Sequence, residues 1–439
     1  MNQDSFFSQA DQLESDLTGS EVLFCSLDGE VSVFARLIRN RIRQAGQVRA
    51  AALGLTLIDG ARQVAGTCGL SGDPQPDLIR ARHLLVRLRE RLDHVPDDPY
   101  LHYSTAPGAS QRQVGEAVPP AEKAIAELIA AADGLDLVGI WASGEISEGL
   151  ASSTGHRHWH RSLSFNLDWS LYLETDKAVK ASYAGFHWDA APLHQKLAAM
   201  REGLRIMARP ARVLEPGRYR AYLAPAAVGE LIDMLAWGGF DLKNHRTHQT
   251  PLLKLVRGER TFAAQVNIRE EHARGLTAGF TAEGFIKPAG VNLIEGGRFG
   301  HCLVDARSGS EYGEIVNAAG ESPESVALEA GDLPLSEALA RLDTGLFIGN
   351  LWYCNWSDPN DCRITGMTRF GTYWVEHGEI VAPVKVMRFD DSLYHLLGDR
   401  LEALTAEREL ILSAQTYDGR STDSALLPGL LVSGIDLAL

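Results

Sequence analysis

The residues from 21 to 70 alternate between apolar and polar types, and this pattern constrains the fold more than any other feature of the chain. In "EVLFCSLDGEVSVF" and "QVRAAALGLTLID" an apolar residue recurs at every second position, as in strands that bury one face. Gly46 and the turn at Asp59-Gly60 are expected to divide this region into several antiparallel strands. A second alternating region, residues 137–186, predicts more strands of the same kind.

Apolar residues at helical spacing predict helices around these strands. The Pro- and Gly-rich segment 95–120 is expected to be a loop, and His377-Gly378 is expected to turn a hairpin. This order favours an α+β fold over a parallel doubly wound sheet. The predicted helices cover residues 6–17, 76–95, 121–135 and 192–210.

A chain of 439 residues is too long for one ordinary core, so two domains are expected. The charged, Pro-containing segment "ARPARVLEPGRY" is the candidate boundary. We therefore predict an N-terminal α+β domain, residues 1–209, built on an antiparallel sheet with helices. A strand-rich C-terminal domain is predicted for residues 210–439.

The charge and the apolar content limit the classes of partner. A net charge of -15 argues against nucleic acid, whose phosphates require a basic surface. No apolar run approaches the roughly 20 residues of a membrane helix, so no membrane is expected as a partner. The N-terminus has no signal-peptide pattern, and five sparse cysteines suit a reducing compartment. These features predict a cytoplasmic protein.

The stretch "YRAYLAPAAVGELIDML", residues 219–235, runs from a strand-like piece into a helix. Its apolar residues Val228, Leu231, Ile232 and Leu235 share one face of that helix. Pro225 suits the first helical turn, where its missing N–H would have no partner.

Several segments, in this order, resemble the TldD/PmbA peptidase family. They cover most of the chain from about residue 40 and are clearest in the second half. The resemblance implies a two-domain peptidase fold that acts as a pair of subunits on extended peptides. The segments are "VRAAALGLTLIDG", "SLSFNLDWSLYLETD", "LEPGRYRAYLAPAAVGELIDML", "AEGFIKPAGVNLIEGGRFGHCLVD" and "ITGMTRFGTYWVEHGEIVAPVKV".

In that family the active, TldD-like subunit carries His-Glu-x-x-x-His on the helix after a strand, and a cysteine near the C-terminus completes the zinc site. Matched to this motif, the two metal-ligand positions hold Pro225 and Glu230, and the general-base position holds Ala226. Proline and alanine have no donor for zinc, and no cysteine follows Cys362. The resemblance thus implies a non-catalytic, TldE-like chain without a catalytic residue or zinc of its own.

Residues five apart on a regular α-helix point about 140° away from each other. The active motif therefore requires a locally widened helix, of the kind found at functional sites. Without a metal to hold it, a plain helix is expected at Pro225. The partner implied is a TldD-like catalytic subunit that supplies zinc, or a second copy of this chain.

Two histidine groups leave a second hypothesis open, a self-sufficient peptidase with a displaced metal site. His156, His158 and His160 alternate, so on a strand they would share one face. His245 and His248 lie three residues apart, and His272 could join them if a loop brought the three together. The alternative without a metal is that both groups are ordinary polar residues on the protein surface. A third hypothesis for the function is a homodimer that binds peptides without cutting them.

The segment "GLFIGNLWYCNWSDPNDC" is rich in aromatic residues and asparagines. Trp352, Tyr353 and Trp356 could pack against a bound peptide, and Asn355 could form hydrogen bonds with the peptide backbone. The alternative is ordinary strand packing followed by a turn at Asp358-Pro359. These four residues are the candidate substrate-binding residues.

Overall fold

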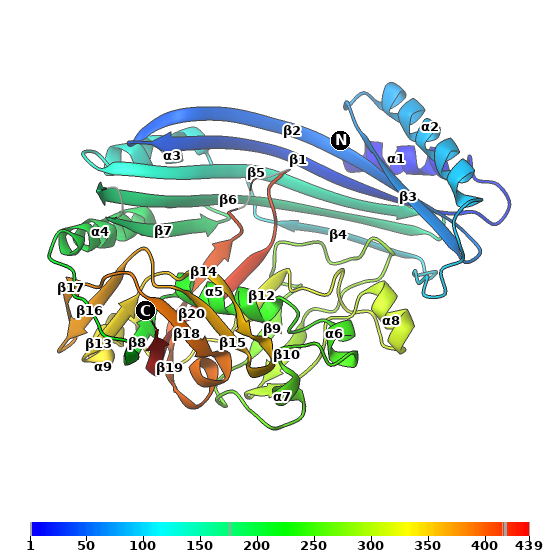
Figure 1. Ribbon diagram of the computed structural model, residues 1–439. Coiled ribbons are helices and arrows are strands. Elements are labelled where there is room, and N and C mark those ends of the chain that lie inside the picture. The colour runs from blue at the N-terminus through cyan, green and yellow to red at the C-terminus, as the bar shows by residue number, and fades with distance from the viewer. Residues whose placement is uncertain (1, 175–176, 415, 417–418, 439) are drawn as a thin grey trace.

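The computed structural model describes residues 2–174, 177–414, 416 and 419–438, and it contains two large β-sheets (Figure 1). Strands from the first part of the chain form a seven-stranded sheet, and strands from the second part form a thirteen-stranded sheet. The predicted α+β fold, with an antiparallel N-terminal sheet and a strand-rich C-terminal part, is confirmed. Within the described residues, no helix is long and apolar enough to cross a membrane.

The N-terminal sheet has the strand order β3-β2-β1-β5-β6-β4, and β7 also pairs with β6. All pairs are antiparallel except β4 with β6. β4 and β7 pair with the same edge of β6, but with different segments of that strand. Among the described residues, no strand pairs with the outer edge of either β4 or β7. The strands are β1 (Val22–Ile38), β2 (Arg41–Asp59), β3 (Arg62–Gly69), β4 (Gly108–Val114), β5 (Asp136–Ser152), β6 (His156–Glu174) and β7 (Lys177–Gly185).

Two details of this sheet differ from the prediction. Gly46 does not interrupt a strand but lies inside β2; the hairpin turns instead at Arg39 and Asn40, whose φ angles of 53° and 55° are left-handed. Asparagine tolerates the left-handed conformation, so the turn can form without a glycine. Because no glycine marks it, the turn was hard to recognise in the sequence. Strand β4 lies in the segment predicted to be a loop. That prediction is wrong because Ser110 to Gln113 are all polar and show no alternation with apolar residues.

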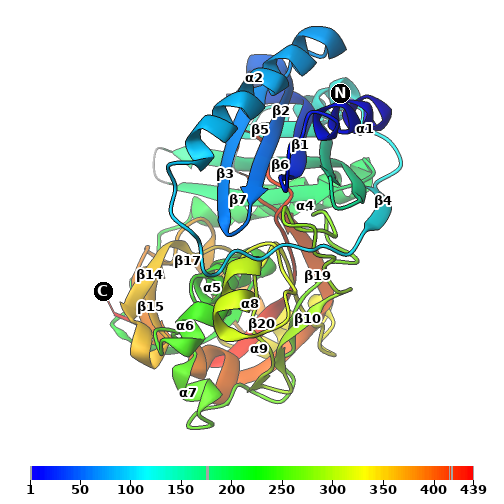
Figure 2. The same ribbon diagram turned by 90° about the vertical axis from the view of Figure 1, so that its right-hand side faces the viewer.

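Four helices cover the N-terminal sheet near its two ends (Figures 1 and 2). α1 (Gln3–Glu14) and α2 (Pro74–Leu92) pack at one end, and α3 (Ala121–Ala131) and α4 (Ala190–Met207) pack at the other. The leucines at helical spacing in α2 are buried, as the sequence pattern predicts. Each pair of helices therefore closes a core of its own beneath the same long strands.

The C-terminal sheet follows the path β11-β10-β9-β12-β20-β8-β13-β16-β17, to which four further strands are joined. The predicted hairpin at His377-Gly378 connects β16 with β17. The strands are β8 (Gly217–Leu223), β9 (Ile268–Glu270), β10 (Val291–Glu295), β11 (Arg298–Phe299), β12 (Ser325–Leu328), β13 (Gly345–Ile348), β14 (Trp352–Asp358), β15 (Arg363–Met367), β16 (Thr372–Glu376), β17 (Glu379–Pro383), β18 (Arg388–Ser392), β19 (Leu401–Leu412) and β20 (Ser424–Leu437).

Helix α5 (Pro225–Ala236) follows β8 and packs its apolar side into the core of the C-terminal part. Val228, Leu231, Ile232 and Leu235 are all 0% exposed, which confirms the predicted apolar face. The remaining helices are short: α6 (Leu242–Arg246), α7 (Leu253–Val256), α8 (Ala306–Tyr312) and α9 (Ala338–Leu342), with single turns η1 (Leu335–Glu337), η2 (Pro359–Asp361) and η3 (His395–Asp399).

The connection between β19 and β20 reaches up to the N-terminal sheet (Figure 1). Asn166 of β6 donates from Nδ2 to the carbonyl oxygens of Leu412 and Ser413, at 3.4 and 3.1 Å. The Arg420 guanidinium donates to the Ser164 carbonyl oxygen and hydroxyl, at 3.2 and 2.7 Å. The two parts of the chain are thus joined through buried and partly buried polar contacts.

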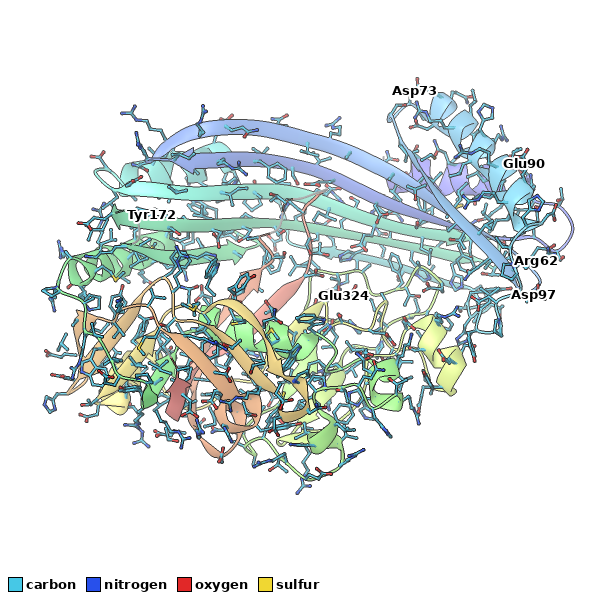
Figure 3. The ribbon with its side chains drawn as sticks, in the orientation of Figure 1. Arg62, Asp73, Glu90, Asp97, Tyr172 and Glu324 are labelled. Atoms are coloured by element: carbon cyan, nitrogen blue, oxygen red, sulfur yellow. The ribbon has the colours of Figure 1, made fainter. Side chains whose placement is uncertain are left out.

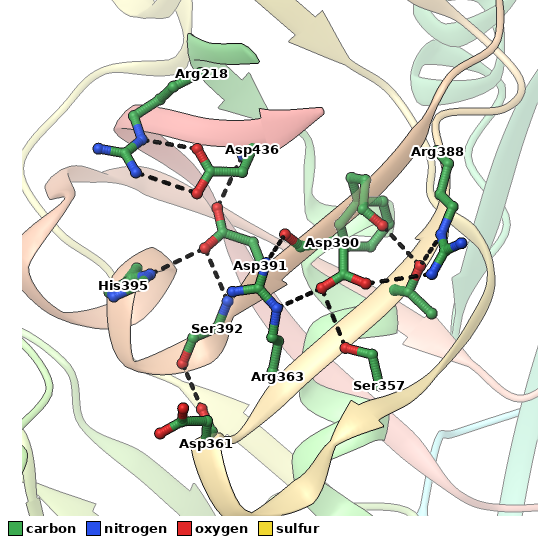
Figure 4. A network of polar contacts seen from close by, with 12 residues as sticks. Arg218, Ser357, Asp361, Arg363, Arg388, Asp390, Asp391, Ser392, His395 and Asp436 are labelled. Carbon is green, nitrogen blue, oxygen red and sulfur yellow. Dashed lines mark hydrogen bonds and ion pairs between the residues drawn. The ribbon is translucent and has the colours of Figure 1, made fainter. Parts of the chain in front are cut away.

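A network of polar contacts surrounds Asp391 at the end of β18 (Figure 4). This carboxylate is 0% exposed and accepts from Arg400, 2.8 Å away, and from the backbone N–H of Asp436, 2.9 Å away. His395 Nδ1 lies 3.1 Å from its other oxygen. The network ties β18, β20 and the turn η3 together away from the cleft described below.

The connection between the two sheets runs from Met207, at the end of α4, to Gly217, at the start of β8. Within it, the Arg212 N–H donates to the Pro383 carbonyl oxygen at 2.7 Å. The predicted domain boundary at residues 209–210 lies in this connection and stays a prediction.

Candidate functional site

Helix α5 lies at the junction of the two parts of the molecule and carries Pro225, Ala226 and Glu230, the three residues that the sequence resemblance matches to the metal motif. Pro225 is its first residue, and the helix continues as a regular α-helix to Ala236. Pro225, in the first turn, points about 140° away from Glu230 on this regular helix. Because the apolar side of the helix is buried, Ala226 and Glu230 lie on the opposite side, and all three residues are only partly covered. This side faces two adjoining cavities.

The two cavities have volumes of about 390 and 510 Å³. Ala226 and Asn350 line both, as does the segment 180–182 of β7, so the cavities form one continuous cleft. Pro225 lines only the larger cavity, and Glu230 lines only the smaller one. The side of α5 that would carry a catalytic motif therefore faces the cleft.

Strand β7 forms one wall of this cleft. It pairs with β6 on one side, and no described strand pairs with its other side. Lys180, Ala181 and Ser182 line both cavities along that wall. A strand edge with unpaired N–H and C=O groups can bind an extended chain by main-chain hydrogen bonds.

The smaller cavity is acidic. Two of its carboxylates have a cation partner: Lys180 lies 3.1 Å from Asp168, and Lys287 lies 2.6 Å from Glu324. The other carboxylates that line it are Glu230, Asp233 and Asp423, and no salt bridge joins them to a described residue. Burial raises the pKa of all three carboxyl groups, and neighbouring carboxylates raise it further. Such a cavity favours a cationic group or a proton.

The donors that zinc requires are not assembled on this side of α5. Pro225 and Ala226 offer no ligand atom, and among the described residues no histidine or cysteine lines either cavity. The C-terminal segment does reach the cleft, since Leu412, Asp423 and Ser424 line it, but it carries no thiol. The residues present therefore do not fit a catalytic zinc ion at this position.

The alternating histidines of β6 share one buried face of the strand, where they hold a loop of the C-terminal part. His160 Nε2 lies 2.6 Å from the Leu276 carbonyl oxygen, and His158 stacks on Phe280. His156 Nδ1 lies 3.3 Å from His158 Nε2. Burial lowers the pKa of His158 and of His160 to about 4, so both rings are neutral near pH 7.

His245 and His248 line a third cavity, of about 660 Å³, which shares no lining residue with the cleft. His245 Nε2 lies 2.7 Å from the Gly239 carbonyl oxygen, and His301 and Cys302 line the same cavity. His301 and Cys302 follow β11, which ends at Phe299. Among the described residues these groups do not bring three ligand atoms within 4.8 Å of one another.

The aromatic segment forms strand β14 and lies beside α5. Trp352 and Tyr353 are exposed, Arg369 lies over the Trp352 ring at 4.7 Å, and Trp356 packs against the C-terminal core. Asn355 accepts from the Trp356 N–H. None of these four residues lines the two cavities, whereas Asn350, two residues before Trp352, lines both.

Sequence reasoning missed several cleft residues: Lys180 to Ser182, Asp233, Asn350 and Asp423. Asp233 carried a usable signal, because it follows Glu230 by three residues and so shares its side of the helix. The others come from distant segments that only the tertiary fold brings together.

Comparisons with known proteins agree with this architecture. The family model described as the PmbA/TldA metallopeptidase C-terminal domain matches residues 216–439. TldE from Thermococcus kodakarensis has a similar structure, with a TM-score of 0.79 and 13% identity over 99% of this chain and 100% of that chain. A candidate modulator of a DNA gyrase from Thermotoga maritima gives 0.75 and 14%, with 100% of both chains covered. No curated protein matches in sequence.

The two-sheet fold is shared with these solved structures, and its C-terminal part is a metallopeptidase-type domain. The family model covers the whole C-terminal part, and the solved structures share the fold over the full chain. The chain belongs to the TldD/PmbA metallopeptidase family.

Proposed function

We propose that this chain is the non-catalytic subunit of a cytoplasmic zinc metalloprotease dimer. In this role it encloses an extended peptide, and a TldD-like partner supplies the zinc. The observation that carries the proposal is the side of α5 facing the cleft: Pro225 and Ala226 occupy motif positions there and offer no ligand atom, while the cleft itself remains open.

The edge of β7 supports the peptide-binding part of the proposal. A peptide laid along Lys180, Ala181 and Ser182 would pair through its main chain, which tolerates many sequences. The acidic smaller cavity would then accept a basic side chain or the amino terminus of the peptide. The larger cavity is lined mainly by apolar groups, including Met200, Phe347 and Tyr373, and would accept an apolar side chain.

The test compares peptide cleavage by this chain alone, by a TldD-like chain from the same organism, and by a mixture of the two. The substrate is an unstructured peptide that carries both basic and apolar residues. We expect cleavage to need the intact partner, to increase when this chain is added, and to stop with a chelator. Cleavage by this chain alone, stopped by a chelator, would overturn the proposal in favour of a self-sufficient peptidase. Peptide binding by a homodimer without cleavage in any mixture would favour a binding protein.

A matched pair of variants tests the cleft. Ala226→Trp fills the region where the two cavities meet, whereas Ala198→Trp places the same side chain on an exposed position of α4 outside them. We expect only Ala226→Trp to lower cleavage by the mixture, by about tenfold or more. Equal activity of the two variants would exclude this cleft as the peptide site.

A further inference from the structure

Three potential metal ligands meet in the C-terminal sheet, away from the motif positions on α5. Glu270 ends β9, His272 follows two residues later, and Glu324 directly precedes β12. Because β9 and β12 pair antiparallel with Glu270 opposite Val326, the sheet itself brings the three together. One ligand atom from each lies within 4.8 Å of the others, which is true of no other group of histidine, cysteine and carboxylate side chains in the described part of the chain.

His272 has the orientation of a metal ligand. Its Nδ1 lies 2.9 Å from the Pro288 carbonyl oxygen, which can only accept, so Nδ1 carries the proton. Nε2 of the neutral ring then presents a lone pair. This atom is buried in a side chain that is 3% exposed, and it has no hydrogen-bond partner among the described residues. A carbonyl on one ring nitrogen is the usual means of orienting the other toward a metal.

Glu270 presents a second free acceptor to the same place. Its Oε1 accepts from the N–H groups of Glu324 and Ser325, at 3.1 and 2.8 Å, and lies 3.5 Å from His272 Nε2. Its Oε2 is buried and has no hydrogen-bond partner in the described residues. Two buried acceptors without a donor, on neighbouring side chains, are unfavourable, and a cation bound by both side chains removes that penalty.

Glu324 connects this cluster to the acidic cavity. Its side chain is 29% exposed and lines the cavity, where the underside of the N-terminal sheet meets the C-terminal part (Figure 3). Lys287, with a side chain only 1% exposed, lies 2.6 Å from Glu324 Oε2. The charge of Lys287 offsets that of Glu324, whereas no cation pairs with Glu270 among the described residues. Because Glu324 lines the cavity, an ion could reach the cluster from there.

We propose that Glu270, His272 and Glu324 bind one divalent transition-metal ion, with zinc the best match. An imidazole nitrogen with carboxylate oxygens suits zinc, whereas calcium and magnesium prefer oxygen ligands alone. The ion would fix β9, β12 and the segment of Lys287 and Pro288 beneath the cleft. This site shares no residue with the motif positions and does not depend on the proposed function.

The experiment uses the full chain, stripped with a chelator and desalted. Zinc binding is measured by isothermal titration, and the ligand set is probed by the visible absorption of added Co²⁺. His272→Asn removes the Nε2 ligand and retains an N–H for the Pro288 carbonyl. Glu324→Gln is a second variant in a partly exposed position, and Glu230→Gln is the control in the neighbouring cavity. We expect one equivalent of zinc and a Co²⁺ spectrum, with affinity at least 100-fold lower in His272→Asn and Glu324→Gln and unchanged in Glu230→Gln.

Other results would overturn the inference. If the wild-type chain binds no stoichiometric zinc or Co²⁺, Glu270 and His272 share a proton instead of a metal. Binding that survives in both ligand variants would place the ion elsewhere. If binding is lost only in Glu230→Gln, the ion sits on α5, and that outcome would also count against the non-catalytic role proposed above. Loss of binding in the two ligand variants alone leaves that role untouched.

Discussion

Glu230 and Asp233 lie one helical turn apart on α5 and both line the smaller cavity. Burial raises the pKa of the Glu230 carboxyl, and the charge of Asp233 raises it further. The cleft therefore holds like charges close together in the folded protein. This arrangement has a measurable consequence for stability.

Glu230→Gln is expected to stabilise the protein at pH 8. A carboxyl whose pKa is higher in the folded than in the unfolded chain lowers stability as pH rises from its unfolded value through its folded value. The gain should be about 0.5–1 kcal/mol, because partial exposure screens the repulsion, and it should vanish near pH 4. Urea unfolding at both pH values measures it. Exposed Glu337→Gln serves as control, and an equal gain there would contradict the explanation.

Acidification should destabilise the contact between β6 and the C-terminal loop. The pKa of His158 and His160 is about 4 in the folded protein because burial disfavours the charged rings. The contribution of the two neutral rings to the free energy of unfolding is then fully present above about pH 6.5, the usual histidine pKa. It falls as the pH drops toward 4, because the unfolded chain binds more protons than the folded one.

His160→Gln checks this dependence, because glutamine can still donate to the Leu276 carbonyl and cannot be protonated. The slope of the unfolding free energy against pH gives the number of protons taken up on unfolding. Between pH 6.5 and 4 we expect this number to be smaller by roughly one in the variant. His83→Gln, on the exposed side of α2, should leave the slope unchanged. The same slope in the wild type and the His160 variant would show that this histidine does not control the transition.

Asp391→Asn should be strongly destabilising. It removes the buried anion that Arg400 faces at 2.8 Å. Arg400 keeps its ion pair with Asp436 at 3.1 Å, so the loss is that of a charge-assisted hydrogen bond, about 1.5–3 kcal/mol. Denaturant unfolding measures the loss, and Asp399→Asn, at an exposed position of the same turn, is the control. If the two variants are equally stable, the contacts in Figure 4 contribute nothing to folding.

Arg420→Met should weaken the joint between the two sheets by roughly 1–3 kcal/mol, because the hydroxyl and carbonyl of Ser164 lose their donor. Arg420→Lys should recover little of this, since an ammonium cannot reproduce the planar set of donors. Hydrogen exchange at the centre of β6 reports the change directly. Arg87→Met, on the surface of α2, should leave that exchange as it is in the wild type.

Much of the fold could be predicted because local periodicity reflects burial. The helix at Pro225, its apolar face and the long antiparallel strands all follow from residues near one another in sequence. Strand β4 could not be predicted in this way, because its polar residues carry no alternation and only tertiary pairing with β6 makes it a strand.

Among the residues that line the cleft, those on α5 could be singled out from the sequence, whereas those brought in by tertiary assembly could not. Pro225, Ala226 and Glu230 could be placed because they share one short helix. Asn350 and Asp423 could not, since they approach that helix only through the crossing of distant strands. The cluster of Glu270, His272 and Glu324 was missed for the same reason: its last member is more than 50 residues from the others.

The contact between Arg420 and the N-terminal sheet also limits how this protein is made. The Arg420 N–H donates to Glu30, 390 residues earlier in the chain. Contacts so far apart in sequence slow folding, because a large part of the chain must be ordered before they form. During synthesis β1 and β6 leave the ribosome long before the segment that completes them. The N-terminal sheet must therefore wait, partly uncovered, until the segment around Arg420 has been made, and the nascent protein is most exposed to aggregation in that interval.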